Sequence, residues 1–380
     1  MVRQTCIPRI FNLMLFLVFS HNLWAQTTPS PEAYSDSQEL ENFDPEIVIQ
    51  GRLTLVSTLL NNPSAQPLLA QALNAEWSLS TLHERVRTQL ILRGSLPSPE
   101  LGSVTPLFQI PRANIRIRFD GWRLTAGITR LSWGEGFLFN AGDLLFGKLG
   151  LPSPLGQINP GQESFGDETA LMTALYTSLD DYSYIEALVL TPPLPYQPLP
   201  RDIALTRAGA RLVTKPFGIK TELSYLYNEG AHLAAATLQG HFLANLWASV
   251  AANVLDPFQT LNLTFGILSL YNLGGGDSGP ISNLSFGLEA QYKPAQAQED
   301  SLWLYPQLSW ASPWQDQISL MALVAPFQPS TMISLGYLGR LYQGLTYQLL
   351  LSLQGGGATS TFGWNRTGNV SLTAVIDYHF

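Results

Sequence analysis

Seven arginines between residues 85 and 123 have the spacing that points most directly to chemistry. They are Arg85, Arg87, Arg93, Arg112, Arg116, Arg118 and Arg123, and they alternate locally with apolar residues, as in NIRIRF at 114–119. A two-residue period places alternate side chains on opposite faces of a β-strand. The pattern therefore predicts three neighbouring strands that carry guanidinium groups on one face.

These guanidinium groups are expected to face water, because an arginine that faces lipid near mid-membrane costs roughly 2–4 kcal/mol. A wall of arginines would attract anions or, with acids opposite it, create a transverse field across a pore. The alternative interpretation is that each arginine pairs with a neighbouring acid and only stabilises the structure.

A second informative stretch is TRLSWGEGFLFNAGDLLFGK at residues 129–148. Its residues Arg130, Trp133, Gly134, Gly136, Asn140, Asp143 and Leu144 resemble the pattern Arg-x-x-Trp-Gly-x-Gly followed by Asn-Pro-x-Asp-Leu of bacterial outer-membrane, porin-like β-barrel families. Ala141 stands where those families usually have proline. The resemblance implies a transmembrane barrel and is silent on its solute.

The same stretch begins the longest predicted loop, residues 133–166. Tryptophan anchors at membrane interfaces, and asparagine and aspartate cap turns. We hypothesise that this loop folds into the barrel as a constriction formed by Trp133, Glu135, Asn140 and Asp143, with both acids facing the arginines. An ordinary outer loop is the alternative.

Enzymatic and metal sites find little support in the sequence. After the first 25 residues the histidines are His83, His232, His241 and His379, and none has a metal-ligand spacing such as His-Glu-x-x-His. No glycine-rich loop matches a phosphate-binding motif, and no serine is paired with a base. We therefore expect no catalysis, no cofactor and no bound metal.

The N-terminus has the three parts of a secretory signal peptide. Arg3 and Arg9 precede an apolar run from Ile10 to Phe19, and Ala25 provides a small residue for cleavage, with Ser20 as a second possible point. We predict a signal peptide at 1–25 and a disordered periplasmic leader at 26–45. Cys6 is the only cysteine, so the exported chain has no thiol.

Composition favours a barrel with one lipid-facing surface. Charged residues make up 13% of the chain, about half the usual share of a soluble domain, and aromatic residues make up 11%. The apolar run of the signal peptide is too short for a membrane-spanning helix, and no later apolar run is long enough for one. Acids outnumber bases, with a formal net charge of -8, which argues against nucleic acid as a partner.

From residue 46 to 380 the sequence reads as short alternating runs separated by turn residues, short and long connections following each other. We predict an all-β, antiparallel transmembrane barrel of about 18 strands, with short periplasmic turns and long outer loops. Sixteen strands is the alternative, because the alanine-rich residues 232–255 are compatible with one helix and residues 274–280 are long for a periplasmic turn. Residues 63–74 are also compatible with a helix.

The last run, VSLTAVIDYHF, alternates apolar and polar residues and ends on Phe380. An alternating strand with a terminal aromatic resembles the segment that the barrel-assembly machinery of Gram-negative-type bacteria recognises. The resemblance implies that Tyr378 and Phe380 form an assembly signal and that this machinery is a partner.

Together these features predict a porin-like channel in the cell outer membrane, in contact with its lipid, for passive or weakly selective transport of small polar solutes. A transporter of hydrophobic compounds and a surface-exposed adhesin are the alternatives. The sequence leaves the solute open, as well as the choice between a monomer and a homotrimer.

Overall fold

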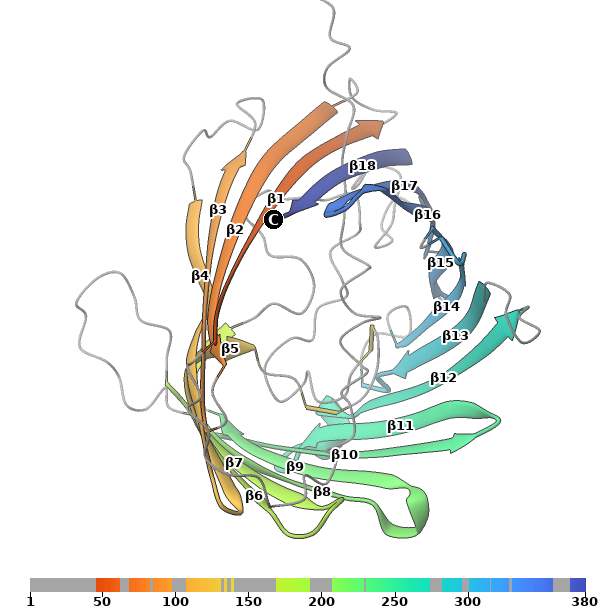
Figure 1. Cartoon of the computed structure of the whole chain (residues 1–380). Helices are drawn as coiled ribbons and strands as arrows, with labels where there is room; N and C mark the ends of the chain where they lie inside the picture. The colour runs from red at the N-terminus through yellow and green to blue at the C-terminus, as the bar shows by residue number, and fades with distance from the viewer. Residues whose placement is uncertain are drawn as a thin grey trace, which may run out of the picture.

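In a computed structural model of the whole chain, the described residues form 18 strands, one short 3-10 turn and one four-residue helix (Figure 1). The structure describes residues 46–61, 68–82, 85–97, 107–130, 133–134, 138–139, 169–191, 207–228, 230–273, 282–295, 301–314, 316–327, 330–357 and 370–380. The predicted signal peptide and leader lie outside these residues.

The strands follow one another around a ring. They are β1 (Glu46–Asn61), β2 (Leu68–Leu82), β3 (Val86–Pro97), β4 (Leu107–Phe119), β5 (Trp122–Arg130), β6 (Thr169–Ser178), β7 (Tyr184–Thr191), β8 (Arg207–Thr214), β9 (Lys220–Asn228), β10 (Ala231–Phe242), β11 (Ala244–Asn253), β12 (Asn262–Leu273), β13 (Ser282–Tyr292), β14 (Leu302–Ala311), β15 (Gln317–Ala325), β16 (Ser330–Tyr342), β17 (Leu345–Gly356) and β18 (Val370–His379). The 3-10 turn η4 (Pro216–Gly218) joins β8 to β9, and α3 (Pro257–Thr260) joins β11 to β12.

Every strand pairs antiparallel with its neighbours in sequence, and β1 also pairs with β18, so the sheet closes into a barrel. The predicted fold class and the count of 18 strands are confirmed. The alternative of 16 strands is wrong, because residues 232–255 form most of β10 and β11 and not a helix. Alanine favours helices locally, but the pairing of β10 and β11 with each other and with β9 and β12 overrides this preference.

The helical interpretation of residues 63–74 is wrong for its second part, because Leu68 already begins β2. Among the residues that the structure describes, no helix has the length and apolar character needed to cross a membrane.

Alternation gives the barrel two chemically different faces. On β18, Leu372 and Tyr378 are exposed on one face, whereas Ser371, Thr373 and Asp377 are buried on the other. Exposed leucine, isoleucine, phenylalanine and tryptophan side chains occur on the outer face in nearly every strand. A closed barrel with an apolar outside satisfies its backbone hydrogen bonds and can lie in lipid.

We call the end at which the even-numbered strands finish the inner end, because barrels of this class keep both termini in the periplasm. In the first half, the connections at the inner end are short and those at the outer end are long, as at 120–121 against 131–168. The second half departs from this rule, most clearly at two connections. The outer connection between β9 and β10 has only residues 229–230, and the inner one between β12 and β13 spans 274–281.

The seam between β1 and β18 extends to the last residue. The Gly51 amide donates to the Phe380 carbonyl at 2.8 Å, and the Phe380 amide donates to the Gly51 carbonyl at 2.9 Å. A Cβ atom at Gly51 would lie 2.3 Å from the Phe380 ring, so only glycine leaves room for this ring. Arg52 also binds Asp377 across the seam, with 2.9 Å between Nε and Oδ1.

Candidate functional site in the barrel lumen

The predicted arginine strands are β3, β4 and β5, and their register brings the guanidinium groups onto one face. Arg87 lies directly opposite Arg116, and Arg118 lies directly opposite Arg123. Arg112 and Arg93 share this face by parity, which is the side away from the exposed apolar residues Leu92, Ile115 and Trp122. Arg85 lies one residue before β3, so its predicted place within a strand is wrong by one position.

Most of these guanidinium groups have no acidic partner among the described residues. The ion pairs found there include one from this set, between Arg93 Nη2 and Glu76 Oε2 at 2.9 Å. Arg123 lies with its Cζ atom 4.3 Å from the centre of the Tyr176 ring, a cation–π contact. Arg87, Arg116 and Arg118 are exposed. We call β3–β5 with these arginines the arginine wall.

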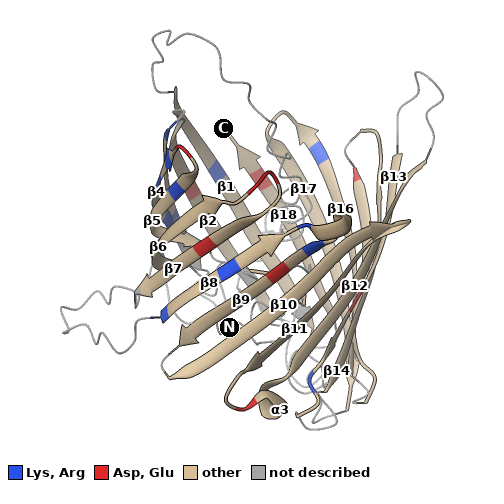
Figure 2. Cartoon of the chain, turned by 90° about the horizontal axis from the view of Figure 1, so that it is seen from below, with Lys and Arg blue, Asp and Glu red and all other residues tan. Residues whose placement is uncertain are grey.

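The neighbouring strands β7, β8 and β9 carry a different arrangement of charge, visible as alternating acidic and basic bands in Figure 2. Arg211 Nε binds Glu186 Oε2 at 2.6 Å, and its Nη1 lies 3.5 Å from Glu222 Oε2. The guanidinium also lies 5.6 Å from the Trp133 ring and 5.5 Å from the Tyr184 ring. Here each charge is compensated, and Glu222 is almost fully buried.

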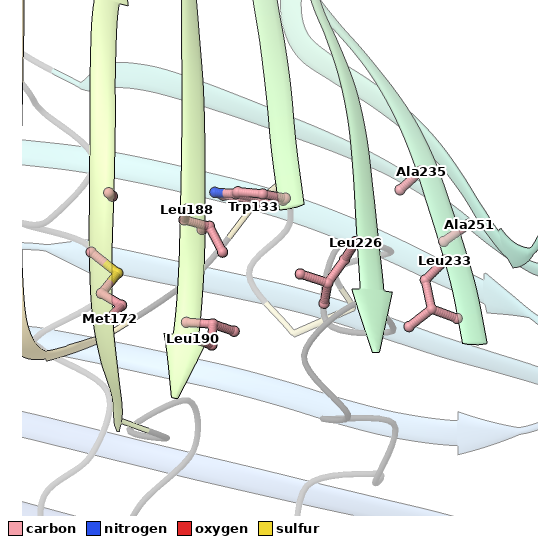
Figure 3. Packing of buried hydrophobic residues seen from close by; sticks show 9 residues of the cluster. Trp133, Met172, Leu188, Leu190, Leu226, Leu233, Ala235 and Ala251 are labelled. Carbon is pink, nitrogen blue, oxygen red and sulfur yellow. The ribbon is translucent and has the colours of Figure 1, made fainter. Parts of the chain in front are cut away.

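Trp133, three residues after the end of β5, lies inside the barrel (Figure 3). Its side chain is 1% exposed and belongs to a cluster of buried residues from β6, β7, β9, β10 and β11: Met172, Ala174, Leu188, Leu190, Leu226, Leu233, Ala235 and Ala251. A Cβ atom at Gly209 on β8 would lie 3.2 Å from the indole ring, so glycine lets the ring approach that strand. The chain therefore turns inward directly after β5.

Two buried carboxylates bind the backbone of this inward chain. The Gly134 amide donates to Glu222 Oε1 at 2.9 Å. The amides of Leu138 and Phe139 both donate to Glu289 Oε2, at 2.8 and 2.9 Å. We call residues 133–139 the inner segment; its described residues are short yellow stretches inside the ring of strands in Figure 1.

Phe139 extends the contact to the opposite part of the wall. It is 4% exposed and packs in a second buried cluster from β14 to β17: Trp303, Tyr305, Met321, Leu323, Ala325, Met332 and Leu350. The inner segment is thus attached to β9 at one point and to β13–β17 at another. Gly134 and Leu138 are only four residues apart in the chain, so these two points of attachment lie within about 14 Å of each other.

The carboxylates of Glu222 and Glu289 explain how the inner segment is held. A buried charge is costly unless it is hydrogen-bonded, and a carboxylate accepting backbone N–H groups forms bonds that are stronger than neutral ones. Sequence reasoning missed both residues, and it also missed Arg211. The available signal was a single acid at a lumen-facing position in an otherwise uncharged strand, SFGLEAQY for Glu289.

The structure places one of the four predicted constriction residues, Trp133, inside the lumen. Glu135, Asn140 and Asp143 lie outside the described residues, so a constriction formed by all four stays a prediction. The pore-lining role of the arginines and the assembly role of Tyr378 and Phe380 also stay predictions.

The histidines have local partners where the structure describes them. His232 Nδ1 bonds the Tyr225 hydroxyl, His241 Nδ1 lies 2.9 Å from Asn245 Oδ1, and His379 Nε2 lies 2.9 Å from Asp377 Oδ2. Within the described ranges, no group of three or more His, Cys, Asp or Glu residues is placed to hold a metal ion. His83 lies outside these ranges.

Solved structures with similar folds include outer-membrane β-barrel proteins. Wzi of Escherichia coli, a carbohydrate-binding β-barrel involved in group 1 capsule assembly, matches with a TM-score of 0.56 at 12% identity over 87% of this chain and 84% of its own. OccAB3 of Acinetobacter baumannii matches with 0.56 at 6% identity, over 88% and 99%. OccD3 (OpdP) of Pseudomonas aeruginosa matches with 0.52 at 9% identity, over 87% and 91%.

No protein-family model matches the sequence, and no curated protein matches it either. At these identities the structural matches speak for the fold alone. The closed barrel of 18 antiparallel strands, with its apolar outer face, is the fold of an integral protein of the cell outer membrane.

Proposed function

We propose that the protein is a porin-like channel for the passive or weakly selective passage of small polar solutes, and that its arginine wall gives the channel a preference for anions. The observation that carries this proposal is a set of solvent-exposed guanidinium groups, at Arg87, Arg116 and Arg118, without ion pairs among the described residues. Fixed positive charge on one wall raises the local concentration of anions.

The path of the solute is inferred from the exposure of the lumen-facing side chains. On β2–β5 most of these side chains are at least partly open to solvent, such as Ser78, Asn114 and Arg116. On β11–β17 their counterparts, such as Ser249, Gln291 and Ser334, are buried. We therefore infer an off-centre passage along β2–β5, with the inner segment beside the opposite wall.

Purified protein in a planar lipid bilayer tests the proposal. We expect stable ion conductance with an anion-shifted reversal potential in a salt gradient, and Arg116→Ser with Arg118→Ser should move this potential toward zero. Arg340→Ser, which removes an exposed arginine from β16, is the control and should change it less. A well-folded barrel without conductance would contradict the channel, and unchanged selectivity in the double variant would contradict the role of the wall.

A transporter of hydrophobic compounds is the second candidate, because two apolar clusters line the lumen around Trp133 and Phe139. This reading predicts no ion conductance, together with faster entry of an apolar dye into vesicles that contain the protein. Replacing Phe139 with Ser should then reduce dye entry and leave the vesicles tight to ions.

A further inference from the structure

Two neighbouring turns at the inner end of the barrel have an unusual backbone. Phe217, between β8 and β9, has φ 53°, and Leu243, between β10 and β11, has φ 58°. The left-handed region costs a bulky residue roughly 1–2 kcal/mol and is normally given to glycine or asparagine. The inner turn between β4 and β5 follows the usual rule, with Gly121 at φ 79°.

These two residues are also the most exposed large apolar side chains of the described inner turns. Phe217 is 102% exposed and Leu243 is 90% exposed, relative to the free residue. Leaving such a side chain in water forgoes the free energy of burying its apolar surface, about 25 cal/mol per Å². A strained backbone that presents an apolar side chain is explained if that side chain has an apolar environment in the assembled system.

The apolar turns continue the lipid-facing surface of the barrel. Ile219 has the outward parity of Leu223 on β9, and Phe242 has the outward parity of Leu238 on β10, and all four are exposed. A Cβ atom at Gly240 would lie 3.9 Å from the Ile219 side chain, so the two turns adjoin. We call Phe217, Ile219, Phe242 and Leu243 the apolar rim.

A lysine and a tyrosine lie beside the apolar rim at this end of the barrel. Lys215 begins the first of these turns, and its Nζ lies 5.5 Å from the centre of the exposed Tyr182 ring on the next inner turn. Aromatic residues with a nearby lysine are typical of the boundary between acyl chains and phospholipid headgroups. This neighbouring inner turn also carries Asp180 and Asp181, both exposed.

We infer that the apolar rim inserts into the lipid of the inner leaflet, at the level where acyl chains meet headgroups, and fixes the depth and tilt of the β8–β11 side of the barrel. The partner surface is a phospholipid layer, whatever solute passes through the lumen. A second copy of the chain is the rival occupant, which the experiment distinguishes.

Cys6, in the predicted signal peptide, is the only cysteine of the sequence, so single-cysteine labelling of the barrel can test this inference directly. Phe217→Cys and Leu243→Cys would each carry a nitroxide label in phosphatidylethanolamine–phosphatidylglycerol vesicles, and Asp120→Cys, on the polar inner turn, would be the matched control. Power-saturation EPR then compares collision with oxygen, which partitions into lipid, and with a water-soluble nickel chelate.

We expect labels at 217 and 243 to favour oxygen over the nickel chelate by several-fold and the label at 120 to show the reverse. Preferential collision with nickel at 217 and 243 would overturn the inference, because the rim would then face water. Protection from both reagents would also overturn it and would indicate a protein partner. Heat-dependent gel mobility, measured on each labelled variant, confirms that the barrel tested is folded.

Discussion

The arginine wall on β3–β5 and the covered wall on β9–β17 are built by the same alternation of residues and differ in what their lumen-facing charges touch. On the arginine wall, Arg87 faces Arg116 and Arg118 faces Arg123, and the guanidinium groups are largely open to solvent. On the covered wall, Glu222 and Glu289 are buried and accept backbone N–H groups of the inner segment.

The difference separates two uses of charge in one barrel. Charges with partners hold structure, since a buried carboxylate is stable only while its N–H donors stay in place. Charges without acidic partners contribute an electrostatic field to the solvent beside them. Alternation alone predicts that a side chain faces the lumen. Whether its charge stabilises the structure or acts on solutes depends on whether it has a hydrogen-bonding or charged partner there.

The largest effect is expected where Glu222 of the covered wall loses its charged partner on the neighbouring strand β8. Arg211→Gln would leave Glu186 and Glu222 without their guanidinium, and breaking a buried ion pair costs about 3–5 kcal/mol. The free energy of unfolding, measured by urea titration in lipid vesicles, should fall by this amount. Arg93→Gln is the control, because its pair with Glu76 is more exposed and is expected to cost less. Equal losses of unfolding free energy in the two variants would contradict the distinction between the arginine wall and the covered wall.

The second prediction concerns the attachment of the inner segment. Glu289→Ala removes the acceptor of the Leu138 and Phe139 amides, each bond to a charged group contributing about 1.5–3 kcal/mol. At the lower value the two bonds together contribute about 3 kcal/mol. Their loss would shift the equilibrium between the attached and the detached segment by about a hundredfold.

We expect single-channel recordings of Glu289→Ala to show larger or more frequently fluctuating conductance. Glu289→Gln keeps a carbonyl acceptor at the same place and should stay closer to the original protein. If alanine and glutamine variants conduct alike, the carboxylate does not hold the segment.

Much of the fold could be predicted from sequence because each strand carries its own period-2 signal. The alternating run NIRIRF lies in β4, and the alternating run at the C-terminus forms β18. The larger errors fall where local composition and pairing disagree. β2 begins at Leu68 within a helix-compatible stretch, and the alanines of β10 and β11 are held in strands by their neighbours.

The lumen was less predictable because its contacts join residues far apart in the chain. Gly134 and Glu222 are 88 residues apart, and Leu138 and Glu289 are 151 apart. Parity places each acid on the inner face but gives no information on which backbone it meets there. Trp133 was singled out by its resemblance to a porin-like pattern, whereas its burial between β6 and β11 depends on the closed barrel.

The smallest expected effect has the opposite sign and comes from the arginine wall. Directly opposed like charges in neighbouring strands destabilise a sheet, by roughly 0.2–1 kcal/mol for a pair. Arg116→Gln removes the charge opposite Arg87 and keeps a side chain that forms hydrogen bonds, so the free energy of unfolding should rise slightly. The gain should shrink in high salt, because these groups are exposed and screened. A loss of stability of the size expected for Arg211→Gln would instead mean that Arg116 has a structural partner, and the contrast between the two walls would then fail.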